Sequence, residues 1–526
     1  MTLGRGDHPA GRSAQAGGGG WLRLHQLFDA SLARDGGRPF IFLPGGATLS
    51  HAELGRQVDA LEAELRDAAV RPGDRVMVVA ENCPEHVALI LACSRVGAWS
   101  CGVNARMAPA ELAAFVAQAD ARRLYYTAAV SDAAAAHARA AGATPSVLPG
   151  LQCGAVKADA VAEIGPGAEA VAAIIFTSGT TGTPKGVLVS HDGLTHFGRV
   201  SAESRQLGPH DRSYACLPMT HIFGLATLLA ASLHAGAGLV MRARFDPAEL
   251  VEALAHEQVS QLQGPPTLFV RLLAHLHERG IEHPAAPQLR YLYTGAGPLD
   301  LGLKQRVEAT FGQPLHHGYG LSEFAGSVHV TALGEHRNDT SAGLRVEDAE
   351  LAIVDAEGRD LPTGETGEIW IRGRCLMPGY FRNPAATSQV MRDRGDCGQP
   401  WYASGDLGRL DADGALFVVG RLKEMIIRSG FNVYPAEVEA ALMAFPGIEL
   451  AAVVGQALQG EDAGNEDIVA FVQLRVGEAV LDRDALDAHL RQQLSPYKRP
   501  QRLHVVDHLP MTASGKVLKR ALREGA

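Results

Sequence analysis

The loop 177–186, TSGTTGTPKG, has the highest density of residues that could bind a ligand. It directly follows the apolar run AAIIF. Its glycines let backbone N–H groups turn toward an anion, and its hydroxyls add further donors. Lys185 supplies a positive charge, so the loop suits a polyphosphate. It is not a Walker loop, because the spacing differs and Pro184 disfavours a direct run into a helix. A solvated turn is the alternative interpretation.

A second segment, 316–323 (HHGYGLSE), combines an aromatic ring, a hydroxyl and a carboxylate. Tyr319 lies between two glycines, so nothing bulky prevents its ring from facing a base. Ser322 and Glu323 are adjacent, a pair that suits a phosphate and Mg²⁺. Taken alone this pattern is weak, because a surface turn has a similar sequence.

Four single residues in further segments have chemically suitable side chains. Asp406 ends WYASGD, where a carboxylate after a glycine could accept both hydroxyls of a ribose. Arg421 lies in GRLKE, and Lys516 ends LPMTASGK, ten residues before the C-terminus. His221 lies in the apolar run LPMTHIFG. Each has an ordinary alternative: a turn aspartate, a solvated surface charge or a core histidine.

Apolar periodicity predicts the elements that must position these side chains. Strands are expected at 75–80, 172–176, 238–241 and 289–293, and helices at 21–32, 49–68, 84–96 and 247–257. Strands separated by helices imply an α/β fold with parallel sheets covered on both faces. The charge-free run 223–241 is long enough to span a membrane, but its three glycines and His234 favour a buried helix followed by a strand.

The chain of 526 residues is too long for a single hydrophobic core, so we expect several domains. Residues 1–20 predict a disordered tail, and residues 21–422 a large N-terminal domain. Short strands and tight turns predict a small β-rich subdomain at about 345–420. The mixed pattern of residues 423–526 predicts a small α+β C-terminal domain.

Composition excludes several classes of protein. A formal net charge of −10 provides no broad basic surface, which argues against nucleic acid as the main partner. The seven cysteines include no C-x-x-C pair, which is typical of reduced, buried thiols in a cytoplasmic protein. The N-terminus has no apolar run that could form a signal peptide. We therefore expect a cytoplasmic protein with no membrane span.

Five motifs in this order, TSGTTGTPKG, HHGYGLSE, WYASGD, GRLKE and LPMTASGK, resemble the adenylate-forming superfamily of acyl- and aryl-CoA synthetases, firefly luciferase and peptide-synthetase adenylation domains. The resemblance covers about residues 21 to 520. It implies an ATP-dependent acid–thiol ligase that forms an acyl-AMP, releases pyrophosphate and then makes an acyl-CoA. ATP, Mg²⁺ and coenzyme A would be required, and the C-terminal domain would be mobile.

The resemblance also implies which residues contact the nucleotide. These are Thr177, Ser178, Gly179, Thr180, Thr181, Gly182, Lys185, Gly295, Ala296, Gly297, His317, Gly318, Tyr319, Gly320, Ser322, Asp406, Arg421 and Lys516. Tyr319 would stack on adenine, Ser322 would bond the α-phosphate, and Glu323 would hold Mg²⁺. The family more often has Thr at the position of Ser322. The catalytic residues would be Lys516, His221, Lys185 and Glu323.

The acid and the thiol would bind in two further places. The acyl pocket would be formed by His221, Phe223, Gly264, Gly295, Gly320 and Phe324. Coenzyme A would contact Ser429, Gly430, Phe431 and Asn432 after the C-terminal domain rotates about a hinge at Lys423. Several plant aryl-CoA ligases carry a lysine where this chain has Ile427, so any contact made by that lysine is in doubt.

Several alternatives stay open. An aryl or medium-chain acid is favoured, but Arg271 occupies a position where some short dicarboxylate ligases carry an arginine, unless it is a helix surface charge. A ligase that loads a separate carrier protein is a second alternative, and a non-catalytic nucleotide-binding relative is a third. A peptide-synthetase domain is disfavoured, because the segment around His221 lacks the expected Phe-Asp pair. The residues do not fix the oligomeric state; a homodimer is one expectation.

Overall fold

The computed structural model describes residues 22–177, 185–395, 398–428, 431–458, 466–475, 481–512 and 516–524. The expected tail, 1–20, lies outside them, as do Ser178, Gly179, Thr180, Thr181 and Gly182 of the loop and Ser429 and Gly430. Within the described part, no helix is long and apolar enough to cross a membrane. The six cysteines described are all buried and form no disulfide, as expected.

Two sheets form the N-terminal part of the molecule. The seven-stranded sheet has the order β6 (Thr144–Pro145), β7 (Gln152–Cys153), β5 (Arg123–Tyr126), β3 (Arg75–Ala80), β4 (Trp99–Asn104), β8 (Val171–Thr177), β9 (Lys185–Ser190). Strands β5, β3, β4 and β8 are parallel, and β9 returns antiparallel to β8. The motif TSGTTGTPKG therefore spans the end of β8, the connection to β9 and the start of β9.

The nine-stranded sheet supplies the other wall of the N-terminal part. Its order is β16 (Leu344–Arg345), β15 (Gly326–Val330), β14 (Leu315–Leu321), β13 (Tyr291–Gly295), β12 (Gln261–Gly264), β10 (Arg212–Ala215), β11 (Gly238–Met241), β1 (Pro39–Phe42), β2 (Thr48–Ser50). The strands from β14 to β1 are parallel. The ends of β13 and β14 bring the segment 294–299 (TGAGPL) beside HHGYGLSE.

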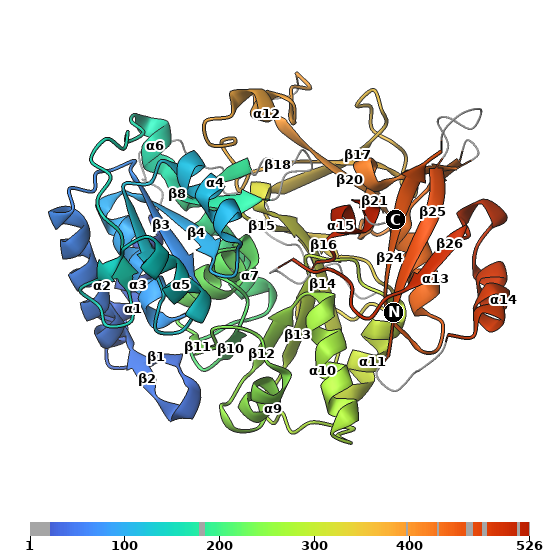
Figure 1. Cartoon of the computed structure of the whole chain (residues 1–526), viewed down its shortest axis with the longest axis horizontal. Coiled ribbons are helices and arrows are strands. Elements are labelled where there is room, and N and C mark those ends of the chain that lie inside the picture. The colour runs from blue at the N-terminus through green and yellow to red at the C-terminus, as the bar shows by residue number, and fades with distance from the viewer. Residues whose placement is uncertain are drawn as a thin grey trace, which may run out of the picture.

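Helices cover both sheets on both faces (Figure 1). The layer between the sheets contains α1 (Leu24–Asp35), α2 (His51–Asp67), α3 (Pro84–Val96), α7 (His191–Ser204), the π-helix Phe223–Ala230 and α8 (Ala231–Ala235). The outer face of the seven-stranded sheet packs on α4 (Pro109–Ala119) and α5 (Asp132–Ala140). The outer face of the nine-stranded sheet packs on α9 (Pro247–His256), α10 (Pro266–Glu278) and α11 (Leu301–Phe311). The short helix α6 (Pro166–Ala170) precedes β8.

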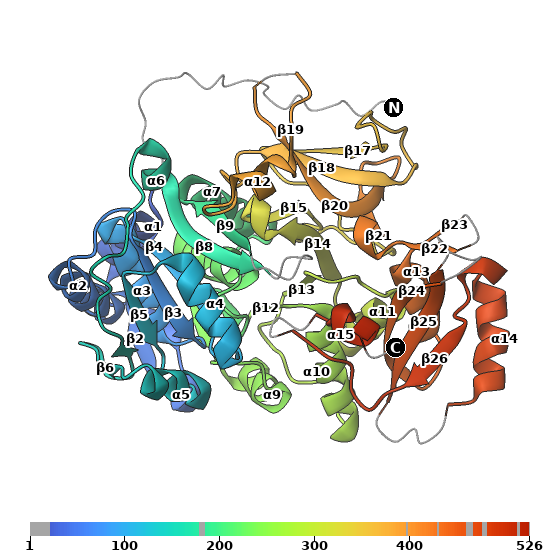
Figure 2. The same ribbon diagram turned by 45° about the horizontal axis from the view of Figure 1, so that its top comes forward.

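The expected β-rich subdomain is a five-stranded antiparallel sheet above these layers (Figure 2). Its strands are β17 (Ala349–Val354), β18 (Gly367–Gly373), β19 (Met391–Arg392), β20 (Trp401–Leu410) and β21 (Leu416–Arg421), with helix α12 (Pro384–Ser388) between β18 and β19. Strand β20 carries Asp406 and β21 ends at Arg421, and these two residues are directly opposite in the register.

The C-terminal part has its own core. It consists of the hairpin β22 (Ile426–Arg428) and β23 (Phe431–Val433), the sheet of β24 (Ile448–Ala457), β25 (Glu466–Leu474) and β26 (Arg502–Val505), and helices α13 (Pro435–Met443), α14 (Arg483–Gln493) and α15 (Lys519–Glu524). A 3₁₀ turn, Leu422–Glu424, connects it to β21, and we propose this turn as the domain boundary.

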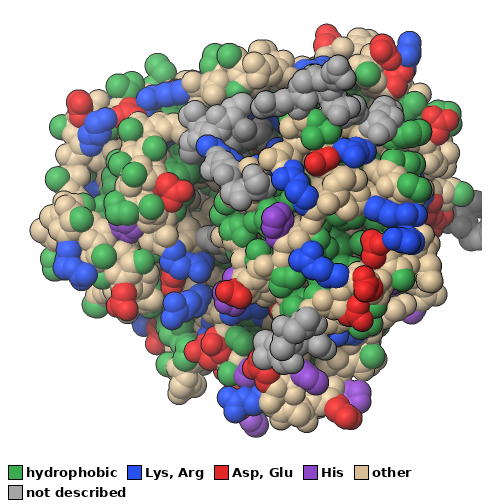
Figure 3. Space-filling model, turned by 45° about the vertical axis from the view of Figure 1, so that its right-hand side comes forward, with side chains coloured by type: hydrophobic (Ala, Val, Ile, Leu, Met, Phe, Trp, Pro, Cys, Tyr) green, Lys and Arg blue, Asp and Glu red, His purple; other side chains and the backbone are tan. Residues whose placement is uncertain are grey.

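The α/β fold class is confirmed, and several expected elements have the expected bounds. Strand β3, strand β11 and helix α3 begin and end where the periodicity predicts. Helix α1 begins at Leu24 rather than residue 21, and strand β13 runs from Tyr291 rather than 289. The run 223–241 is indeed a buried helical segment followed by a strand. Figure 3 shows basic and acidic side chains interspersed over one face of the molecule.

Candidate active site

A cavity of about 830 Å³ lies where the two sheets, the β-rich subdomain and the C-terminal part meet. Its lining comes from the ends of β4, β8, β13 and β14, from the start of the π-helix, from β20 and from the C-terminal loop. Carboxyl ends of parallel strands are the usual place for a ligand site in an open α/β sheet. Of the expected site residues, the lining includes Thr177, Lys185, His221, Phe223, Gly295, Ala296, Gly318, Gly320, Ser322, Glu323, Asp406, Arg421, Lys423 and Lys516.

Lys516 brings the charge of the C-terminal domain into this cavity. Burial, and then the positive charge of Arg421, lower the pKa of its ammonium group, while Asp406 and Glu323 oppose that shift. Lys516 therefore lies close enough to Arg421, Asp406 and Glu323 to interact with all three charges. The C-terminal domain thus contributes a lysine to the same cavity as the expected nucleotide residues.

His221 faces the same space in its neutral form. Its Nδ1 accepts a 3.2 Å hydrogen bond from the backbone N–H of Phe223, which leaves the proton on Nε2. Burial, assisted by the charge of Lys516, lowers its pKa to about 3. At neutral pH the ring can therefore donate a hydrogen bond to an anionic oxygen but cannot act as a cation.

Asp406 joins two expected nucleotide residues. Its Oδ2 accepts a 2.7 Å hydrogen bond from Tyr319 Oη, and its Oδ1 accepts a 3.1 Å bond from Arg421 Nε. Burial, followed by this carboxylate, raises the pKa of Tyr319, so the phenol stays protonated and keeps donating. Tyr319 itself is buried between the lining residues Gly318 and Gly320 and does not line the cavity. One carboxylate thus fixes the orientation of a ring and a guanidinium beside the open space.

Glu323 is a half-buried carboxylate that lines the cavity. Tyr380 Oη donates a 3.0 Å hydrogen bond to Oε1, and the Lys185 ammonium lies 4.8 Å from the centre of the Tyr380 ring. Burial raises the pKa of Glu323, and the Asp406 carboxylate adds to the rise. Mg²⁺ is usually bound by one or two carboxylates together with substrate phosphates. A half-buried carboxylate in the same cavity as Lys185 fits that donor set.

At two positions of the site the backbone passes so close to a neighbouring residue that only glycine fits. A Cβ on Gly318 would lie 2.1 Å from Tyr293 Oη, and one on Gly320 would lie 2.4 Å from the Gly326 carbonyl oxygen. Both positions are on β14, where it passes close to its neighbouring strands. Any side chain would push β14 away and displace Tyr319 between them. Ala296 adopts a positive φ of 64°, which turns the chain at the end of β13.

Five expected residues of the N-terminal part, among them Tyr319, do not line the cavity. Phe324 is fully buried in the core between the sheets. The space beside Gly264 is filled by Leu268 of α10, whose Cδ1 lies 2.5 Å from where a Cβ would be. His317 is buried, with Nδ1 bonded to the Thr340 carbonyl at 3.0 Å. Gly297 faces Pro266. These residues pack behind the residues that line the cavity. The expectation that Phe324 and Gly264 form the surface of the acyl pocket is therefore wrong.

Two other expectations concern residues away from the cavity. Phe431 is 53% exposed and stacks on Tyr497, with ring centres 4.4 Å apart, and neither it nor Asn432 lines the cavity. Arg271 is exposed on α10 and lies over the ring of Phe245, outside the lining. The helix-surface interpretation of Arg271 is therefore the one that its position supports.

Several lining residues had no motif that pointed to them. The bond from Tyr380 to Glu323 joins positions 57 residues apart, so only the folded chain reveals it. Polar and charged lining residues that were also missed are Asn104, Arg106, Glu111, Thr220, Thr227, Tyr293, Ser327, Glu368, Gln389, Arg392 and Tyr402. A possible signal was PGYFRNP, because a tyrosine after Pro-Gly is presented on a turn.

The model of the family described as AMP-binding enzyme matches residues 28–381, and that of the AMP-binding enzyme C-terminal domain matches residues 437–516. Feruloyl-CoA synthase from Amycolatopsis sp is 34% identical over 481 residues, which cover 91% of this chain and 94% of that protein. 4-Coumarate–CoA ligase 5 from Oryza sativa subsp. japonica is 32% identical over 496 residues, which cover 91% and 89%.

Solved structures agree with this grouping. ATP-bound MatB from Rhodopseudomonas palustris has a TM-score of 0.82 at 28% identity, covering 96% of this chain and 99% of that one. The amide bond synthetase McbA from Marinactinospora thermotolerans has a TM-score of 0.80 at 28% identity, covering 95% and 99%. With family models matching both parts of the structure, the chain belongs to the AMP-binding enzyme family, as an AMP-forming acid–thiol ligase.

Proposed function

We propose that this ligase activates an aromatic carboxylic acid as its acyl-adenylate and transfers the acyl group to coenzyme A. The observation that carries the proposal is the enclosure of Lys516 in one cavity with His221, Glu323 and Asp406. A lysine, a neutral histidine and half-buried carboxylates in one cavity suit a reaction between two anions, an acid and ATP. The names of the relatives, feruloyl-CoA synthase and 4-coumarate–CoA ligase, support an aryl acid.

The lining near His221 also favours an aromatic acid. Phe223 and Tyr293 both line the cavity and meet edge to face, with ring centres 5.9 Å apart. Such a pair presents one ring face and one ring edge, the arrangement that a third aromatic ring packs against most favourably. A medium-chain acid would fill the same space without these ring contacts, so we place the aryl class first.

The first half-reaction joins the acid to the nucleotide. A carboxylate oxygen attacks the α-phosphorus of ATP, the bond to the bridging oxygen breaks, and pyrophosphate leaves with that electron pair. Lys516 offsets the charge that builds up on the α-phosphate, and the Nε2–H of His221 orients the carboxylate. Mg²⁺, held by Glu323 and the phosphates, would neutralise charge on the leaving group. Asp406 and Arg421 would hold the ribose side of the nucleotide.

The second half-reaction needs a different arrangement. The thiol of coenzyme A loses its proton and attacks the acyl carbon, and AMP leaves. Because Lys516 occupies the cavity in the present arrangement, we propose that the C-terminal domain rotates about Lys423 before the thiol enters. Rotation would bring the exposed Phe431 and Asn432 toward the cavity. The cytoplasmic location and the homodimer stay predictions.

Pyrophosphate release across a panel of aryl, medium-chain and dicarboxylic acids, with and without coenzyme A, tests the proposal. We expect release that depends on an aryl acid and turns over repeatedly only when coenzyme A is present. Lys516→Ala serves as the inactive control. A single burst that coenzyme A does not relieve would favour a carrier protein as acceptor, and release with medium-chain acids alone would contradict the aryl assignment.

A further inference from the structure

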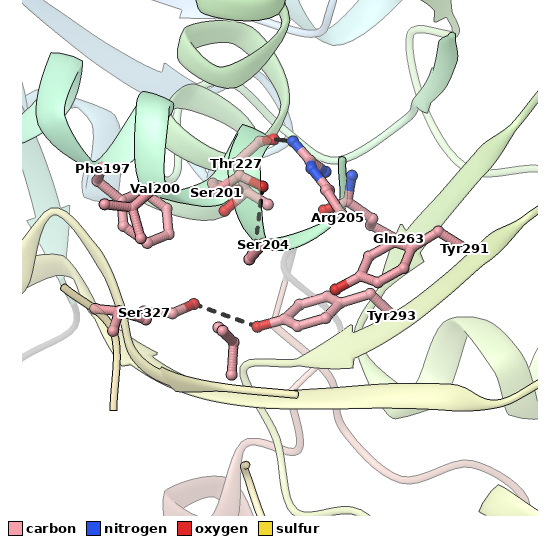
Figure 4. Close-up of a pocket in the computed structure, with 12 residues that line it drawn as sticks. Phe197, Val200, Ser201, Ser204, Arg205, Thr227, Gln263, Tyr291, Tyr293 and Ser327 are labelled. Atoms are coloured by element: carbon pink, nitrogen blue, oxygen red, sulfur yellow. Dashed lines mark hydrogen bonds between the residues drawn. The ribbon is translucent and has the colours of Figure 1, made fainter. Parts of the chain in front are cut away.

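A small chamber of about 10 Å³ lies behind the acyl end of the active-site cavity. Three residues line both spaces: Thr227 of the π-helix, Tyr293 of β13 and Ser327 of β15. Tyr293 Oη and Ser327 Oγ are 3.2 Å apart and share a hydrogen bond across this wall (Figure 4). The far end of the acyl cavity is therefore a thin partition carrying three hydroxyl groups.

Arg205 lies on the other side of that partition. It ends α7, is 1% exposed, and donates from Nη2 to the Thr227 carbonyl (Figure 4). Among the residues that the structure describes, its buried Nε and Nη1 have no hydrogen-bond partner. Burial lowers its pKa to about 10, so the guanidinium is charged at neutral pH. No carboxylate described in the structure forms a salt bridge with it.

Gln263 faces the same chamber from β12. It is 1% exposed, and neither its Oε1 nor its Nε2 has a hydrogen-bond partner within the described ranges. Buried arginine and glutamine side chains are costly unless their donors are satisfied. Two such side chains, aimed at one chamber, together leave three nitrogen donors for a ligand oxygen. The apolar remainder of the lining, Phe197, Val200, Val330 and Val346, excludes bulk water.

We infer that this chamber, with its hydroxyl partition, is a subsite for an oxygen acceptor at the end of the acid opposite the reacting carboxylate. The inference rests on the proposed function. The chamber volume matches a single oxygen-sized group. The acid is therefore one that carries a phenolic oxygen or a second carboxylate, and Arg205 and Gln263 determine specificity for it. Thr227, Tyr293 and Ser327 line both spaces, so they would border that oxygen where it enters the chamber.

The test is the ratio of kcat/KM between acids that differ only in that oxygen. The pairs are 4-hydroxycinnamate with cinnamate, 4-carboxycinnamate with cinnamate, and octanedioate with octanoate. Wild type should prefer the oxygenated member at least tenfold in one of the pairs. Arg205→Met should reduce that preference about tenfold, with the unsubstituted acid used nearly as well as before, because only the polar contact is lost.

Two variants complete the design. Gln263→Leu removes the second polar side chain without touching the contact that anchors the π-helix, so it carries the test if Arg205→Met fails to fold. Arg271→Met removes an exposed cation outside both cavities and should leave every ratio unchanged. Thermal unfolding of each variant confirms that it is folded.

The outcomes separate the readings of the chamber. If the variants change the kcat/KM ratio only for 4-hydroxycinnamate and cinnamate, the subsite binds a phenol. If they change the ratio for a dicarboxylate pair, it binds an anion. Either result supports the subsite. A wild-type ratio near one in every pair, or ratios unchanged in both variants, would overturn it and leave a chamber that holds only water. Pyrophosphate release with none of the acids would contradict the proposed function itself, and the inference with it.

Discussion

Tyr319 and Asp406 are joined by a 2.7 Å hydrogen bond between the end of β14 and the middle of β20. The bond ties the nine-stranded sheet to the β-rich subdomain at the point where both border the cavity. It also positions the tyrosine ring, because the phenol is held at its far end. The nucleotide site therefore depends on packing between two sheets as well as on its motifs.

Tyr319→Phe removes the hydrogen bond to Asp406 and keeps the aromatic ring. We expect the free energy of unfolding to fall by about 1 kcal/mol, the usual net contribution of one hydrogen bond. KM for ATP should change less than about threefold, since stacking on the base needs only the ring. Tyr319→Ala should raise that KM by about tenfold or more. Equal KM values in the two variants, measured by pyrophosphate release, would contradict stacking.

Lys516→Ala separates the two half-reactions. Adenylation should slow by about 10²-fold or more, roughly 3 kcal/mol, because a charge aimed at the transition state is lost. Thioester formation from purified acyl-adenylate and coenzyme A should stay within a few-fold of wild type. The matched control is Arg491→Ala, which removes an exposed cation of the same domain. Loss of both half-reactions in Lys516→Ala would exclude the proposed domain rotation.

Tyr380→Phe removes the hydroxyl that donates to Glu323. That bond opposes the rise in the pKa of Glu323, so without it the carboxyl group should protonate at higher pH. We expect the acid limb of the adenylation pH profile to move upward and the Mg²⁺ requirement to increase several-fold near pH 6. Tyr125→Phe is the matched control, since the buried Tyr125 hydroxyl has no hydrogen-bond partner within the described part of the chain. An unchanged pH profile would remove Glu323 from the metal site.

Buried neutral histidines make the fold sensitive to acid. Burial lowers the pKa of His86 to about 4 and that of His191 to about 3, both below the 6.5 of the unfolded chain. Between the pKa in the folded protein and that in the unfolded chain, the unfolded state binds more protons than the folded state. The free energy of unfolding is therefore highest above pH 6.5 and decreases as the pH falls below it. Each such histidine should cost about 2 kcal/mol between pH 7 and pH 5.

Denaturant unfolding at pH 7, 6 and 5 measures this effect. His86→Leu should show a shallower fall in stability than wild type, by about 2 kcal/mol over that range. His256→Leu, on the exposed surface of α9, should keep the full fall. The same fall in His86→Leu as in wild type would show that His86 does not contribute to acid sensitivity.

Local sequence carried enough information for much of the fold. Helix α3 is bounded by Pro84 at its first position and by Gly97, whose φ of 77° ends the helix, so both signals lie within a few residues of the element. Strand β3 is a six-residue apolar run that is buried throughout. Motif spacing likewise predicted Lys185, Glu323, Asp406 and Lys516 as site residues, and the folded chain gathers all four at one cavity.

Other parts of the site depend on contacts between distant segments. Phe324 directly follows a motif and Gly264 was expected in the acyl pocket, yet Phe324 is buried in the core and Leu268 fills the space beside Gly264. Tyr380 and the chamber of Arg205 and Gln263 arise only where strands, helices and the β-rich subdomain pack together. Short-range patterns encode backbone conformation and residue chemistry, so the sequence by itself determined the elements, the family and the reaction class. Which side chain reaches the cavity depends on how segments that are far apart in the sequence pack together, and only the tertiary structure decided this.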